Sequence, residues 1–183
     1  MLYSAKELLE TLDAFPSNII ADLGCYLLLG TTSSEDKVLC HLYFDKEFVP
    51  ILFVCNLKQQ QQKDIKRLFV YGFFGNYASN NDYFEMELSI KFNCTGWPIE
   101  IVKINSGREK RHGRGTLGLR FLEDYIIPSI NSIIMNLIHG SSISYIYGIS
   151  ADLTDDTNAL ARAKFYCRNG FTLRNGQFYK YLI

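Results

Sequence analysis

The sequence runs Lys110-Arg111-His112-Gly113-Arg114-Gly115-Thr116 between an apolar run at 99–104 and a helical run that begins near Thr116. Two glycines one residue apart allow a tight turn and let backbone N–H groups approach a ligand closely. The partly positive N-terminus of the following helix favours phosphate as that ligand. Four side chains of this stretch are basic or can become so, which strengthens the prediction: Lys110, Arg111, His112 and Arg114. We therefore expect this loop to hold a pyrophosphate.

The composition indicates one ordinary globular domain. Of the 183 residues, 48% are hydrophobic, which is enough to build a core. Lysine and arginine number 19, and so do aspartate and glutamate. The net charge therefore indicates neither a nucleic-acid nor a membrane partner. Because the sequence contains no internal repeat and no linker, we expect a single domain over 1–183.

The cysteines and the N-terminus indicate a reducing compartment. The five cysteines contain no Cys-x-x-Cys pair, which argues against a disulfide framework and a zinc site, so we expect no metal. Lys6, Glu7 and Glu10 interrupt the pattern that a signal peptide would need. No apolar run reaches the about 18 residues of a membrane span. We expect a cytoplasmic protein without membrane contact.

Apolar periodicity predicts a mixed α/β fold of the α+β type. Alternation at 83–92 indicates a half-buried strand, and helical spacing after Thr116 indicates a long helix that Pro128 kinks or restarts. The predicted strands are 25–29, 38–44, 48–57, 67–75, 83–92, 99–104, 144–150, 171–174 and 177–183. The predicted helices are 4–14, 116–138 and 154–169. This order favours a mixed, mostly antiparallel central sheet flanked by helices.

Turn residues predict two hairpins. The segment 93–98 has turn chemistry, so 83–92 and 99–104 should pair as antiparallel arms that lead into the glycine loop. Asn175-Gly176 is a typical type I′ turn signal between 171–174 and 177–183.

Read literally, Gly113-x-Gly115-x-x-Gly118 is the dinucleotide-binding pattern. That pattern requires an acidic residue about 20 positions further on, within a parallel strand–helix–strand unit. The segment 133–140 contains no carboxylate, and the preceding strand is the second arm of a predicted hairpin. A dinucleotide-dependent oxidoreductase is therefore disfavoured. The phosphate-binding loop of nucleotide triphosphatases is also excluded, because no Gly-Lys-Ser/Thr follows at the right distance.

The order of a strand, a basic-x-x-Gly-x-Gly loop and a helix is the remaining pattern. It resembles the acyl-CoA pyrophosphate loop of the GNAT superfamily of N-acetyltransferases. The family motif is Gln/Arg-x-x-Gly-x-Gly/Ala, and Lys110 stands here at its first position. A second motif, Phe165-Tyr166-x-x-x-Gly170-Phe171, resembles the end of the helix after that family's fifth strand. One helix and one strand separate the two motifs, as in the family. With their flanks they cover 83–183, whereas 1–82 resembles no family in detail.

This resemblance implies transfer of an acetyl group from acetyl-CoA to a primary amine, by direct attack within a ternary complex. The pyrophosphate would bind the N–H groups of the loop, with help from Lys110, Arg111 and Arg114. The loop residues so assigned are His112, Gly113, Arg114, Gly115 and Thr116. Backbone groups between Val102 and Ile104 would bind the pantetheine arm and the carbonyl. Asn158, one residue from the family's usual asparagine position, is a further candidate for the pantetheine.

Two catalytic residues follow from the same resemblance. Tyr166 matches the tyrosine that protonates the departing thiolate, and a phenol of pKa about 10 is a competent acid at neutral pH. A buried core aromatic is the alternative interpretation of Tyr166. Glu100, on the strand that enters the loop, is the candidate general base, with Glu85 and Glu87 as alternatives.

The acceptor remains open between a small-molecule amine and a protein amine, and nucleic acid is not indicated. A catalytically inactive CoA-binding or regulatory module of the same fold is the second hypothesis, because the sequence marks no firm base. The apolar stretch 126–138 is suited either to the core or to a homodimer interface.

Overall fold

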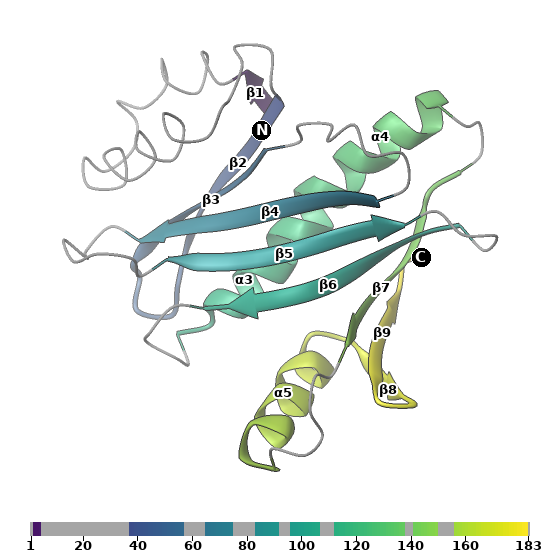
Figure 1. The fold of residues 1–183 in the computed structure, drawn as a ribbon. Helices are drawn as coiled ribbons and strands as arrows, with labels where there is room; N and C mark the ends of the chain where they lie inside the picture. Colours follow the sequence, from purple (N-terminus) through teal and green to yellow (C-terminus); the bar gives the residue numbers. More distant parts are fainter. Residues whose placement is uncertain are drawn as a thin grey trace.

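The computed structural model describes residues 2–4, 37–56, 65–74, 83–91, 96–106, 112–137, 141–149 and 156–182. Within these ranges, nine strands form one sheet in the order β1-β2-β3-β4-β5-β6-β7-β9-β8 (Figure 1). The strands are β1 Leu2–Ser4, β2 Lys37–Phe44, β3 Pro50–Asn56, β4 Ile65–Phe74, β5 Phe84–Lys91, β6 Trp97–Asn105, β7 Ile143–Ile149, β8 Thr172–Arg174 and β9 Gln177–Tyr181. The helices are α3 Arg114–Phe121, the π-helical turn η2 Leu122–Ile126, α4 Ile127–Leu137 and α5 Asp156–Arg168.

The sheet is mixed and mostly antiparallel, as the sequence predicts. Among the strands that the structure describes, only β6 and β7 pair in parallel. Most predicted strands agree with the structure to within two residues. The predicted strand 48–57 begins two residues before β3, because Phe48 and Val49 belong to the β2–β3 turn. The predicted strand 25–29 and the predicted helix 4–14, apart from Ser4 in β1, lie outside the described residues.

Strand β5 shows how the core is built. Phe84, Met86 and Leu88 alternate along it and are completely buried, as the period-2 pattern predicts. The helices join the same buried cluster through Phe121 and Ile130. Figure 1 shows α3 and α4 behind the central strands, with α5 beside β7. The helix-facing side of the sheet is therefore the apolar one.

One long helical arm follows the glycine loop. Helices α3, η2 and α4 follow one another without a gap from Arg114 to Leu137, and α4 begins at Ile127, directly before Pro128. The π-helical turn η2 ends two residues before the proline. Proline lacks an N–H and crowds the carbonyl four residues earlier, and a wider turn relieves that crowding. The arm therefore continues through the proline.

The connection through this arm corrects one expectation about the strand before the loop. Strand β6 is indeed the second arm of a hairpin with β5, but it also pairs in parallel with β7. The glycine loop therefore does begin a strand–helix–strand unit with parallel strands. One of the two arguments against a dinucleotide site is removed, whereas the missing acidic residue is unaffected.

The C-terminal hairpin is confirmed. Asn175 and Gly176 both have positive φ, 49° and 75°, as a type I′ turn requires. The turn joins β8 to β9, and β9 pairs with β7 in the antiparallel sense. This hairpin places Phe178 beneath α5, where it stacks on Tyr166.

Close packing of α3 on the sheet gives a first prediction. A Cβ at Gly118 would lie 2.2 Å from Cζ of Phe84. Gly118→Ala should lower the free energy of unfolding by about 1–3 kcal/mol, although alanine favours helices by about 1 kcal/mol. Urea unfolding measures this loss, and Phe84→Leu in the same chain should recover part of it. A more stable Gly118→Ala variant would contradict the packing.

Candidate functional site

The parallel pair β6–β7 opens at one end. Its pairing runs from Trp97 opposite Ile143 to Ile101 opposite Gly148 and ends there. Strand β6 continues to Asn105, still paired with β5 on its other side. Figure 1 shows the two strands diverging beyond this point. Residues 102–105 therefore present a strand edge that β7 does not cover.

A β-bulge lies at the start of this open edge. Leu88 of β5 pairs with Ile101, but Glu87 pairs with Lys103, so Val102 is the extra residue. Val102 is half exposed, with 50% of its surface accessible to solvent. A bulge interrupts the ladder and turns backbone groups away from it. Val102, the first residue of the segment predicted to meet a pantetheine arm (Val102 to Ile104), is thus the one left out of regular pairing with β5.

The glycine loop enters α3 without a side-chain cap. Gly113 is the N-cap, with φ of 82°, and its carbonyl accepts a hydrogen bond from the N–H of Leu117 at 3.1 Å. First-turn N–H groups of a helix have no acceptor within that helix. Because no side chain of the described residues caps it, this end can receive an anion. Lys110 and Arg111 lie outside the described residues.

The two sequence motifs touch each other. A Cβ at Gly115 would lie 3.0 Å from Cε2 of Phe165, so the aromatic residue of the second motif packs on the second glycine of the first. A different structural requirement explains each glycine: Gly113 adopts a positive φ, Gly115 leaves room for Phe165, and Gly118 leaves room for Phe84. One backbone conformation and two packing contacts therefore account for the spacing that resembles a dinucleotide-binding pattern.

The structure places the Arg114 side chain in the interior rather than at the loop surface. The side chain is 2% exposed, and Nε lies 3.4 Å from Oδ2 of Asp45. The guanidinium also lies over the ring of Phe74, 3.9 Å from its centroid. Side-chain contact with a pyrophosphate, as expected from the sequence, is therefore not the arrangement seen. What Arg114 offers to the loop is its backbone.

The β2–β3 turn is the part of the site that sequence reasoning missed. Oδ1 of Asp45 accepts hydrogen bonds from the N–H groups of Glu47 and Val49 at 2.9 and 3.0 Å. The N–H of Lys46 donates to the carbonyl of His112 at 3.3 Å, and Glu47 lies 3.1 Å from Nδ1 of His112. The turn thereby holds the loop in place. Its only local signal is a turn-forming aspartate, 69 positions from Arg114.

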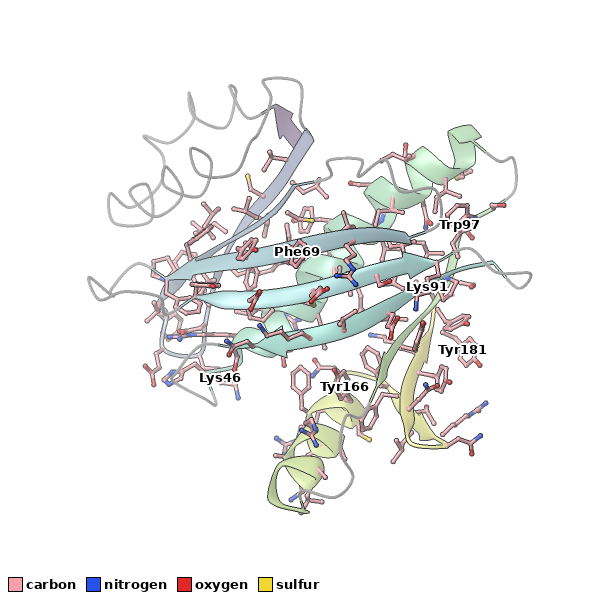
Figure 2. The ribbon with its side chains drawn as sticks, in the orientation of Figure 1. Lys46, Phe69, Lys91, Trp97, Tyr166 and Tyr181 are labelled. Atoms are coloured by element: carbon pink, nitrogen blue, oxygen red, sulfur yellow. The ribbon has the colours of Figure 1, made fainter. Side chains whose placement is uncertain are left out.

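Tyr166 lies against Gly148, the last residue of β7 that pairs with β6. Its hydroxyl is 3.2 Å from the position that a Cβ of Gly148 would occupy, and Figure 2 shows it where α5 meets the sheet. Its ring is buried and stacks on Phe178 with centroids 4.5 Å apart. Burial raises the pKa of the Tyr166 phenol above its ordinary value. The group therefore stays protonated at neutral pH.

Glu100 lies on the opposite face of the sheet from Tyr166. It pairs with Tyr147, one step before the end of the β6–β7 ladder, and neighbouring residues of a strand point to opposite faces. Oε2 of Glu100 accepts from Nζ of Lys91 at 3.0 Å and from the hydroxyl of Tyr147 at 3.2 Å. The alternatives are also paired, Glu85 with Lys103 and Glu87 with Arg67.

The remaining predicted residues are placed as follows. The backbone of Asn158 is in α5, and its side chain lies outside what the structure describes. In the described part of the chain, no three His, Cys, Asp or Glu side chains gather as metal ligands. No helix found there is long and apolar enough to cross a membrane.

No family model, curated protein or solved structure matches the chain.

The buried Asp45–Arg114 pair gives a second prediction. Asp45→Asn removes one charge and leaves the guanidinium buried without it, so the free energy of unfolding should fall by about 3 kcal/mol. Asp45→Asn combined with Arg114→Met should cost less than the two single changes together. Glu85→Gln, at the exposed pair with Lys103, is the matched control and should cost under about 1 kcal/mol. Equal losses of unfolding free energy from Asp45→Asn and Glu85→Gln would contradict the argument that burial makes the Asp45–Arg114 pair costly to break.

Proposed function

We propose that this protein is an acetyl-CoA-dependent N-acetyltransferase with a GNAT-like fold. The observation that carries the proposal is the contact between Gly115 and Phe165, because it joins the two motifs on which the resemblance rests. These residues are 50 positions apart in the sequence. A chance pairing of two short patterns gives no reason for them to meet at a helix N-terminus.

The open strand edge supports the same proposal. A thioester ligand with a diphosphate tail needs an anion site, an extended channel for its arm and a place for its carbonyl. The start of α3 would bind the anion, and the edge of β6 beyond Ile101, which β7 does not cover, would lie along the arm. The bulge at Val102 supplies backbone groups near the point of divergence, which is where a polarised carbonyl oxygen could accept a hydrogen bond.

The two candidate catalytic side chains flank that point. In the proposed reaction, the amine nitrogen forms a bond to the thioester carbon, and the carbon–sulfur bond breaks as the thiolate leaves. Tyr166 donates its phenolic proton to the thiolate, and Glu100 accepts a proton from the attacking amine. Tyr166 and Glu100 approach from opposite faces of the sheet, next to the last β6–β7 pairs. Donor and acceptor of the acetyl group would then meet across the opening.

Calorimetry with acetyl-CoA tests the cofactor site. The wild type should bind, and Gly113→Asp should weaken binding at least about tenfold, because it adds negative charge and strain at the anion site. Gly170→Asp is the matched control, since Gly170 has the same φ of 82° but lies beyond the end of α5. No binding by the wild type, or equal weakening by both changes, would contradict the proposal. Binding of NADH or FAD instead would favour the dinucleotide alternative.

Turnover tests the role of Tyr166. With tyramine, spermidine and a lysine-containing peptide as acceptors, Tyr166→Phe should lower kcat by about 100-fold or more and leave acetyl-CoA affinity unchanged. The phenol must be protonated to act, and its pKa is raised. Wild-type activity should therefore persist through pH 9 and fall only above about pH 10.

The inactive module is the second candidate, and the engagement of Glu100 by Lys91 favours it. Normal acetyl-CoA binding by the wild type without turnover of any of these amines would support that candidate.

The control for Tyr166→Phe is Tyr181→Phe, which removes the hydroxyl of an exposed tyrosine of β9.

A further inference from the structure

Glu100 is held by donors from two neighbouring strands. Lys91 reaches it from β5 and Tyr147 from β7, and both contact the same oxygen, Oε2. The Glu100 side chain is only 10% exposed. Figure 2 labels Lys91 on this face of the sheet. The carboxylate therefore lies at the junction of three strands.

Two donors on one oxygen define the plane of the carboxyl group. The terminal torsion of a glutamate side chain is broad, so a carboxylate without fixed partners rotates easily. Here Oε2 is engaged twice, and neither contact uses Oε1. Because Glu100 and Tyr147 form the last pair but one before β6 and β7 separate, the orientation is set close to the end of the ladder.

Tyr147 is itself well fixed as a donor. Its ring packs against two other tyrosines, with centroids 5.9 Å from Tyr145 and 6.2 Å from Tyr179. Burial, together with the neighbouring charge of Glu100, raises the pKa of Tyr147 to about 12. The hydroxyl therefore keeps its proton over the whole range in which an enzyme of this kind would work.

We propose that Tyr147, together with Lys91, positions Glu100 so that Oε1 faces the acceptor amine. Tyr147 is then a positioning residue, and the inference rests on the proposed acetyl transfer. The ammonium proton passes to Oε1, which converts the carboxylate to a carboxylic acid and frees the nitrogen lone pair for attack. Oε2 stays bound to Tyr147 and Lys91 throughout, so the carboxyl group does not have to reorient.

Tyr147→Phe tests this role, and the chain supplies a matched control in Tyr179→Phe. Tyr179 belongs to the same ring cluster, but its hydroxyl donates to Gln177 instead of Glu100. With the best acceptor among tyramine, spermidine and a lysine-containing peptide, Tyr147→Phe should lower kcat about tenfold. The KM and the affinity for acetyl-CoA should not change. Tyr179→Phe should be close to wild type, and equal effects of the two variants would overturn the inference.

A double-mutant cycle separates positioning from general damage. In a Glu100→Gln background, Tyr147→Phe should have almost no further effect on kcat, because the group that it orients is gone. Additive losses would overturn the inference. Acetyl-CoA binding and thermal midpoints of all variants identify any change that comes from misfolding.

A spectroscopic readout does not depend on turnover. With ¹³Cζ-labelled tyrosine, the Tyr147 resonance should titrate at lower pH in Glu100→Gln than in wild type, because a nearby negative charge is removed. An unchanged titration would overturn the contact on which the inference depends. If the wild type fails to bind acetyl-CoA, the proposed function fails; if it transfers acetyl groups but Tyr147→Phe is fully active, only this inference fails.

Discussion

The early end of the β6–β7 ladder is the constraint on which the rest of the candidate site depends. Parallel pairing up to Ile101 and Gly148 brings the two strands together, and its end lets them diverge. Backbone groups that have left a ladder need other partners or water, so the uncovered edge of β6 is suited to an incoming polar ligand. Strand β6 stays paired with β5 on its other side, and β7 stays paired with β9. Each of the two diverging strands is therefore held by an antiparallel neighbour.

Small residues decide how closely the helices approach the sheet. Gly118 admits the ring of Phe84, Gly115 admits Phe165, and Gly148 admits Tyr166. Each contact is between a glycine on one element and an aromatic ring on another. Together they fix the start of α3 and the end of α5 relative to the sheet. A ring that meets a bare backbone leaves little room for either element to shift, because packed interiors resist displacement.

A buried ion pair joins the β2–β3 turn to the glycine loop, beside the contacts of Lys46 and Glu47 with His112. Asp45 uses one carboxylate oxygen to order its own turn and directs the other to Arg114. A buried pair of this kind brings modest net stability but is costly to break. It therefore specifies where the β2–β3 turn sits against the glycine loop. The β2–β3 turn lies in the part of the chain that resembles no family, 1–82, and it contributes directly to the shape of the glycine loop.

The sequence by itself determined the local elements: the alternation of β5, the Asn175–Gly176 turn and the helix after the glycine loop. Each depends on periodicity or on backbone preferences within a few residues. Only the tertiary structure decided that β6 also pairs with β7, that Pro128 lies inside a continuous helix, and that Arg114 is buried against Asp45. It also decided which partners hold Glu100. These features join residues far apart in the chain, and local patterns carry no information about which distant residue will be the partner.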